Sequence, residues 1–217
     1  MKLHIASLTV LCLILAAVPA MAQTIYDNGP VNGQVDAWTI NFGFAVSDTF
    51  QVTSGTPVSN ISFWAWVEPG DTASNVEIAI GSTGYFSNNL FDGVVLLSQS
   101  NCFSNNFGFD VCQESGTFNI PGGLNPGNDF LTLENAVTQE GNPLYWDENS
   151  GVGCMSQGCP SSAQENTLGT IPSEAFTLSY IETTTTTSSG TTPEPGSILL
   201  LGAGLLAVAG RLRSKLF

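Results

Sequence analysis

The sequence predicts an all-β fold, a single β-sandwich of jelly-roll type over residues 23–182. Two observations predict it. Apolar and polar residues alternate with a period of two in several short runs, and clusters of Gly, Pro and Asn separate these runs. Such alternation is typical of strands with one buried face. No stretch of these residues combines a helical period with helix caps. A segment of about 160 residues is long enough to bury a core of ordinary size.

The clearest alternation lies in residues 61–68. One face carries Ile61, Phe63, Ala65 and Val67, and the other carries Ser62, Trp64, Trp66 and Glu68. The same period appears in residues 76–80 and 176–180, and in the pairs Phe50/Val52, Phe118/Ile120 and Leu131/Leu133. Turn-forming clusters at residues 68–71, 121–123 and 125–128 separate these runs. Many short strands joined by such loops indicate a sandwich.

Every basic residue lies at one end of the chain. Lys2 and His4 are near the start, Arg211, Arg213 and Lys215 are near the end, and all 18 Asp and Glu lie between them. Without histidine the body has no Ser-His-Asp or Cys-His pair and no imidazole metal ligand. Without Lys or Arg it has no clamp for phosphate or for a nucleic-acid backbone. We therefore exclude nucleotide enzymes and nucleic-acid binders.

The amino end has the three parts of a secretory signal peptide over residues 1–22. Lys2 supplies the positive region, residues 8–18 form the apolar run, and Ala20-Met21-Ala22 fits the small-x-small cleavage pattern. Gln23 is then the first mature residue. A retained membrane anchor is the alternative, but the apolar run is short for a membrane span.

The carboxyl end combines an extended turn, an apolar helix and a basic stop over residues 193–217. Pro193, Glu194, Pro195 and Gly196 precede the apolar residues 198–210, which Arg211, Arg213 and Lys215 follow. The prolines keep the turn out of the helix. The apolar segment predicts a short transmembrane helix, and the basic residues favour the cytoplasmic side. Composition alone also fits a plain tail anchor.

In this order, the three parts resemble the PEP-CTERM sorting signal of Gram-negative bacteria. The resemblance implies that an exosortase, a multi-pass membrane protease, recognises Pro193-Glu194-Pro195 and releases or transfers the upstream protein. It also implies that residues 198–210 anchor the chain transiently in the inner membrane before it reaches the cell surface or the extracellular space. The family often has a denser arginine cluster than the spaced Arg211 and Arg213 here.

The body resembles secreted proteins that carry this tag. Four segments support the likeness: residues 26–30, 36–40, 145–151 and 169–176. The likeness implies the localisation and an all-β fold, not an activity. Between body and tag, the Thr- and Ser-rich residues 183–192 predict an extended, solvated linker. A plain spacer that gives the protease access explains this composition, and O-glycosylation is the alternative.

Five cysteines are present, and Cys12 lies in the signal peptide, so four remain in the mature chain. An even count in an exported protein favours disulfides. Sequence order favours the local pairs Cys102–Cys112 and Cys154–Cys159. The alternative is a zinc site, which would need all four thiolates together in an oxidising compartment.

The acidity of the body has two explanations. The first is solubility and resistance to aggregation outside the cell. The second is calcium, which prefers carboxylate and amide oxygens. Asp147, Glu148 and Asn149 in one loop are the candidate ligands, with Asp27 and Asn28 in another. Neither loop has the ligand spacing of an EF-hand.

Tryptophans beside carboxylates raise the alternative of carbohydrate binding. Trp64, Trp66 and Trp146 could stack on sugar rings of a matrix polysaccharide, although aromatic side chains in a sandwich more often lie in the core. A glycosidase would need two carboxylates about 5–10 Å apart across a cleft, whereas the adjacent Asp147 and Glu148 would diverge. We therefore expect a structural or interaction protein of the cell surface or extracellular matrix, with a carbohydrate-binding module as the alternative and no enzymatic activity.

Overall fold

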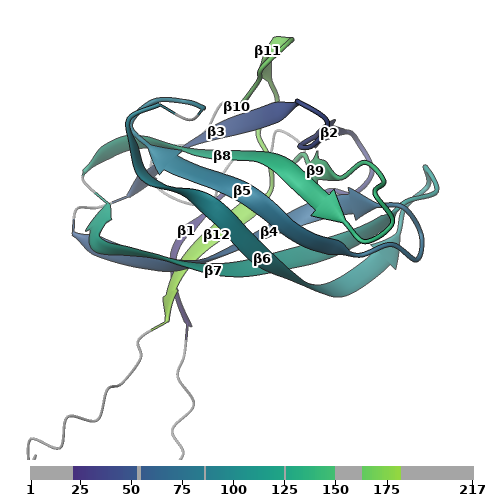
Figure 1. The fold of residues 1–217 in the computed structure, drawn as a ribbon, viewed down its shortest axis with the longest axis horizontal. Helices are drawn as coiled ribbons and strands as arrows, with labels where there is room; N and C mark the ends of the chain where they lie inside the picture. The colour runs from purple at the N-terminus through teal and green to yellow at the C-terminus, as the bar shows by residue number, and fades with distance from the viewer. Residues whose placement is uncertain (1–21, 53–54, 86, 125, 150–162, 182–217) are drawn as a thin grey trace, which may run out of the picture. The chain divides into compact units, whose positions relative to one another are not determined.

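The computed structural model describes residues 22–52, 55–85, 87–124, 126–149 and 163–181 (Figure 1). The chain divides into two units, Met1–Glu182 and Thr183–Phe217, and all described residues belong to the first. The predicted signal peptide, the linker, the sorting segment and the second cysteine pair (Cys154 and Cys159) lie outside the described residues.

Twelve β-strands and no helix make up the described residues, which confirms the all-β prediction. The strands are β1 (Ala22–Asp27), β2 (Ala37–Thr39), β3 (Ala45–Val52), β4 (Thr56–Val67), β5 (Ala73–Gly81), β6 (Asn89–Ser104), β7 (Asp110–Leu124), β8 (Gly127–Thr138), β9 (Tyr145–Asp147), β10 (Ala163–Glu165), β11 (Gly169–Ile171) and β12 (Phe176–Ile181). A helix able to cross a membrane is therefore absent from the part of the chain that the structure describes.

The long strand β6 joins two layers (Figure 1). Its first half, through Leu96, pairs with β5, and its second half, from Leu97, pairs with β7. The strand order is β1-β12-β4-β7-β6-β5-β8-β3-β10-β11, and the small pair β2-β9 adds to β4. The result is a curled antiparallel sheet with two facing halves, which is consistent with a sandwich. The jelly-roll connectivity that the sequence predicted is not shown by this order.

The core lies between the two halves, and the alternation read from β4 is confirmed. Ile61, Phe63, Ala65 and Val67 are all fully buried. They face β5 and β8, whose inward residues are Val76, Ile78, Ile80, Leu131 and Leu133. Burial of such apolar side chains contributes about 25 cal/mol per Å² of surface removed from water.

The two ends of the described domain are adjacent. β1 pairs with β12, and the register places Ala22 opposite Ile181. The predicted first mature residue, Gln23, lies opposite Tyr180 in the same pair. The chain therefore enters and leaves this domain at neighbouring positions.

Candidate functional site: a buried acidic network

The four segments that carry the resemblance come together in space, as far as they are described. β2 pairs with β9, which brings residues 36–40 against residues 145–149. Glu148 forms an isolated bridge with Glu174, and the backbone N–H of Asn28 donates to the carbonyl of Phe176 at 2.8 Å. Segments far apart in the sequence therefore build one site at the side of the core.

Asn28 lies at the centre of this site and is fully buried. Its Nδ2 lies 2.9 Å from Oδ2 of Asp48, 2.8 Å from Oγ of Ser173 and 2.6 Å from the carbonyl oxygen of Glu174. The hydroxyl of Tyr26 donates to Asn28 Oδ1 at 2.9 Å. One amide thus links β1, β3 and the segment before β12.

Asp48 is the carboxylate that these donors surround. Besides Asn28, it accepts from Ser173 Oγ at 2.9 Å and from the backbone N–H of Glu174 at 2.8 Å. Burial nevertheless raises the pKa of Asp48 to about 6, although these hydrogen bonds favour the charged form. The network is therefore made of neutral donors around an acid that has no basic partner.

Glu174 is the acid of this site whose carboxyl group receives no hydrogen bond. Its side chain is fully buried, and neither carboxylate oxygen has a hydrogen-bond partner. Burial raises the pKa of Glu174 well above its ordinary value, and the charges of Asp48, Glu148, Asp147 and Asp36 raise it further. Such an environment favours the protonated, uncharged carboxyl group.

Asp147 connects the site to the opposite surface of the sheet. Its carboxylate accepts from the backbone N–H of Asn32 at 2.8 Å, from that of Gly33 at 2.9 Å and from Nε1 of Trp66 at 2.5 Å. Burial raises the pKa of Asp147 to about 6, against the effect of these bonds. Gly33 has a φ of 68°, and a Cβ there would lie 2.9 Å from the ring of Phe103. A glycine therefore suits this position, because a side chain here would be strained and would displace the ring of Phe103.

The predicted calcium ligands do not converge on one point. Asp147 faces Trp66 and the loop at residues 32–33, while Glu148 accepts from Nε1 of Trp38 at 2.8 Å. Asn149 donates instead to the carbonyl of Asn28 and to Ser173. Within the described ranges, no group of three or more His, Cys, Asp or Glu could hold a metal ion.

The second predicted calcium loop also separates its two side chains. Asp27 accepts from the backbone N–H of Gly29 at 3.0 Å, whereas Asn28 points into the network. The two loops named from the sequence do meet, through Asn149 and Asn28. They meet as hydrogen-bond donors and acceptors rather than as a set of metal ligands.

Another buried acid, Glu114, lies apart from the network, in the core itself. Glu114 on β7 pairs with Phe63 in register, is fully buried, and has no hydrogen-bond partner at either oxygen. Burial raises the pKa of Glu114 to about 8. At neutral pH this side chain is therefore mainly a neutral carboxylic acid.

The tryptophans predicted to stack on sugars are largely covered, which corrects that prediction for two of them. Trp146 is fully buried and belongs to the core, and Trp66 is only 6% exposed. The ring of Phe107 stacks on Trp66, with 5.4 Å between centroids. Trp64 is half-buried, and Phe103 lies 6.0 Å from it. The reason is that the β6–β7 hairpin folds its aromatic residues over this face.

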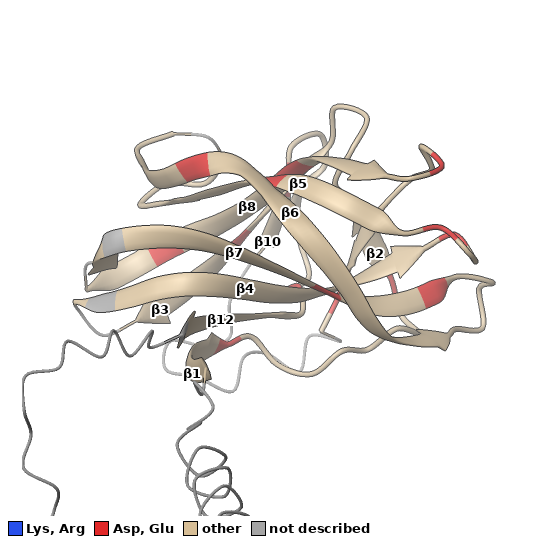
Figure 2. Cartoon of the chain, turned by 60° about the horizontal axis from the view of Figure 1, so that its bottom comes forward, with Lys and Arg blue, Asp and Glu red and all other residues tan. Residues whose placement is uncertain are grey.

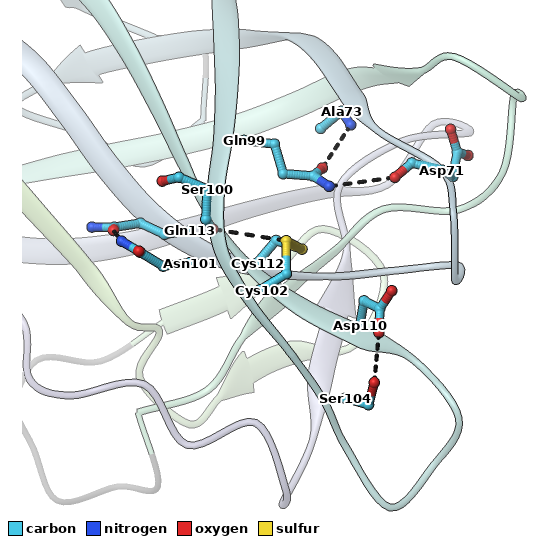
Figure 3. The surroundings of a disulfide bond; sticks show 10 residues. All are labelled: Asp71, Ala73, Gln99, Ser100, Asn101, Cys102, Ser104, Asp110, Cys112 and Gln113. Atoms are coloured by element: carbon cyan, nitrogen blue, oxygen red, sulfur yellow. Dashed lines mark hydrogen bonds between the residues drawn. A yellow bond between two sulfur atoms is a disulfide. The ribbon is translucent and has the colours of Figure 1, made fainter.

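The disulfide Cys102–Cys112 closes this hairpin, as predicted (Figure 3). Near it, Asn101 Nδ2 donates to Gln113 Oε1 at 2.6 Å and Ser104 Oγ donates to Asp110 Oδ1 at 2.8 Å. These contacts join the two arms of the hairpin on both sides of the disulfide. The loop that covers Trp66 is therefore held at its base.

Four functional residues of the two acidic sites were not predicted from the sequence: Asp48, Glu114, Ser173 and Glu174. The sequence does contain a signal that could have identified two of them. Asp48 shares the inward parity of Val46 and Phe50, and Glu114 shares that of Phe118, so the alternation itself places both acids on the core side. Ser173 and Glu174 lie in a segment named only for its resemblance.

The fold and the site thus define an acidic all-β domain with several buried carboxyl groups, of which Asp48 and Asp147 accept hydrogen bonds from neutral donors. Figure 2 shows Asp and Glu on many strands and no Lys or Arg in the described part. The chain carries the PEP-CTERM protein-sorting motif at residues 191–214, which confirms the resemblance noted for this end. No curated protein and no solved structure matches the chain. The motif marks an exported protein that an exosortase directs to the cell surface or the extracellular space.

Proposed function

We propose that the protein is an acidic structural or interaction protein of the cell surface or extracellular matrix. An exosortase cleaves it after a transient stay in the inner membrane, and the β domain then acts without a resident cofactor and without catalysis. The observation that carries this proposal is that buried carboxylates of the domain accept hydrogen bonds from other groups of the same domain. Asp48 and Asp147 are fully buried, and each accepts several hydrogen bonds from within the domain.

Buried acids of this kind support a structural role for the network. A general acid or base must reach the proton that it transfers, whereas Asp48 and Glu174 are fully buried. The network instead connects β1, β3, β9 and the segment before β12, which lie far apart in the sequence. We therefore assign these acids to the architecture of the domain.

Binding of matrix polysaccharide is the second candidate. Sugar recognition of the expected type needs exposed aromatic rings on one surface. The burial of Trp146 and Trp66 counts against it, and of the three tryptophans only Trp64, beside Phe103, is partly exposed. We consequently favour contact with a protein partner.

Processing tests the proposal directly. In the native host, intact mass of the recovered protein should correspond to a chain that begins at or near Gln23 and ends near Pro195. The Glu194→Ala variant should accumulate unprocessed in the inner membrane, because the tripeptide is altered. Thr187→Ala, in the predicted linker, is the matched control and should be processed normally. Recovery of wild-type protein that still ends at Phe217 would reduce the tag to an ordinary anchor.

A further inference from the structure

One exposed surface of the domain mixes large apolar side chains with paired glutamates. It lies on the outer side of β6, β5 and β8. The register places Val94 beside Glu77, and Glu77 beside Glu134. The next row places Leu96 beside Asn75, and Asn75 beside Val137. We call this surface the acidic–apolar face, and define it by Val94, Leu96, Glu77, Glu134 and Val137.

The apolar members of this face are unusually exposed. Leu96 is 78% exposed, Val94 is 65% exposed and Val137 is 46% exposed. Along β6, residues 94–97 read Val-Val-Leu-Leu, and Val95 is buried in the core. A continuous apolar run is typical of a strand that is covered on both sides. In this chain only the inner side is covered.

The other end of the same outer surface is already covered by the chain itself. Ala79 and Thr132, the next pair along β5 and β8, are buried. Thr132 donates to Ser47 Oγ at 2.9 Å, and the backbone of Tyr85 in the β5–β6 loop donates to the same oxygen. The loop therefore closes one end of this surface and leaves the acidic–apolar face open. Open apolar surface of this kind marks interaction sites.

The charges on the face identify the chemistry of its partner. Like charges directly opposite each other on neighbouring strands are destabilising, and Glu77 and Glu134 are such a pair. Asn135 Nδ2 donates to both, at 2.8 Å and 3.1 Å. Partial burial raises the pKa of Glu134, and the charges of Glu77 and Asp92 raise it further. The described chain contains no Lys, Arg or His, so a cation for this pair must come from another molecule.

We infer that the acidic–apolar face docks a basic, amphipathic segment of a partner protein. Its Lys or Arg side chains lie against Glu77 and Glu134, and its apolar side chains cover Val94 and Leu96. A second copy of this chain would present the same glutamates and no base, so it would add repulsion. The inference rests on the interaction role proposed above and names the class of partner.

The test measures binding of three synthetic peptides to the exported protein purified from its host. The first peptide alternates Lys and Leu, the second alternates Glu and Leu, and the third is oligolysine. Fluorescence anisotropy at physiological ionic strength should show saturable binding of the Lys/Leu peptide only. Leu96→Ser and Glu77→Gln should each weaken this binding about tenfold.

Two matched controls separate this face from the rest of the surface. Leu168→Ser changes another highly exposed leucine, in the β10–β11 hairpin, and Glu140→Gln removes one exposed charge elsewhere. Both should leave the affinity unchanged. A double variant, Glu77→Lys with Glu134→Lys, should transfer the preference to the Glu/Leu peptide. Urea unfolding of each variant shows whether it is folded.

Three outcomes would overturn the inference. Oligolysine could bind as tightly as the Lys/Leu peptide, with no effect of Leu96→Ser, which would assign binding to overall acidity. Leu168→Ser could weaken binding as much as Leu96→Ser does. Sedimentation could reveal a dimer that Leu96→Ser dissociates, which would assign the face to a second copy. These measurements test peptide binding and not processing. Failure of the proposed localisation is detected separately, by the intact mass of the recovered protein.

Discussion

The side-chain amide of Asn28 donates a 2.9 Å hydrogen bond to the carboxylate of Asp48, which lies 20 positions further along the chain. Both residues are fully buried. In most proteins an acid at such a depth is paired with a base. Here the described part of the chain offers no base, and a neutral amide, a serine hydroxyl and a backbone N–H take its place. The site consequently depends on these neutral donors.

Replacing the central amide by an acid should therefore be severe. Asn28→Asp removes the donor to Asp48 and adds a buried carboxyl group beside it, so we expect a loss of at least about 3 kcal/mol in the free energy of unfolding. Urea unfolding measures the loss. Asn119→Asp makes the same chemical change at an exposed position of β7 and should stay within about 0.5 kcal/mol of the wild type. Similar losses in both variants would show that net charge, not the network, is responsible.

The buried acids also predict an unusual pH dependence. Burial raises the pKa of Asp48 and of Asp147 to about 6 and that of Glu114 to about 8. A group whose pKa is higher in the folded state contributes stability that is complete below its unfolded pKa and is lost as the pH rises through the folded pKa. We expect the free energy of unfolding to fall steadily from about pH 5 to pH 8.5.

Urea unfolding at constant ionic strength across this range tests the prediction. The range begins near pH 5 because the stability that Asp71 and Glu165 contribute has the opposite pH dependence and is lost as the pH falls further. Burial raises their pKa, but hydrogen bonds to both carboxylates outweigh it and leave the pKa lowered. Stability that rises between pH 5 and pH 8 would contradict the structure of the acidic sites.

Glu114 should account for the alkaline part of this dependence. The Glu114→Gln variant keeps the shape of the side chain but cannot ionise, so it should be more stable than the wild type above about pH 8. Each unit of pKa shift corresponds to about 1.4 kcal/mol, so the gain is on the order of a few kcal/mol. Glu140→Gln, at an exposed position, is the control and should not alter the pH profile. An unchanged profile in Glu114→Gln would mean that Glu114 is solvated.

The strands that the sequence predicted are those in which apolar residues recur with a period of two. β4 shows the alternation because its inner residues face the core while Ser62 and Trp64 on its other face are only partly buried. β6 was not predicted, since its residues 94–97 are apolar on both sides. The strands β2, β9, β10 and β11 have three residues each, which is too short for a period to be read. β10 and β11 form a hairpin with each other, whereas β2 pairs with β9 and β10 with β3 over distances along the chain that leave no local pattern.

The sequence predicted some residues of the acidic network, but with a different chemistry. Asp147, Asn149 and Asn28 were named as calcium ligands because their side chains are oxygen donors in loops. The structure uses Asn28 and Asn149 chiefly through their Nδ2 atoms, toward Ser173 and Glu174. Which partner an amide meets depends on contacts across more than a hundred positions, such as that between Asn28 and Glu174. Spacing within one loop cannot predict such a contact.

The disulfide at the base of the β6–β7 hairpin should stabilise the aromatic cover of Trp66. The double variant Cys102→Ala/Cys112→Ala opens a loop of 10 positions, which the chain-entropy model values at about 3 kcal/mol. Release of Phe107 from Trp66 should also change the tryptophan fluorescence before global unfolding. Non-reducing peptide mapping of the wild type should find this bond together with Cys154–Cys159. A crossed pairing would refute the local assignment of the second pair.

Added cations provide the last test of how the acidic domain is stabilised. Monovalent salt should raise the melting temperature, because screening weakens repulsion between carboxylates. Calcium at matched ionic strength should produce an equal shift, since Asp147 and Glu148 already accept hydrogen bonds within the domain. A site present only in the folded state would instead add RT ln(1 + [L]/Kd). An excess with calcium that Asp147→Asn abolishes, and that the control Asp92→Asn preserves, would establish a calcium site at this loop and overturn the assignment of Asp147 to the hydrogen-bond network alone.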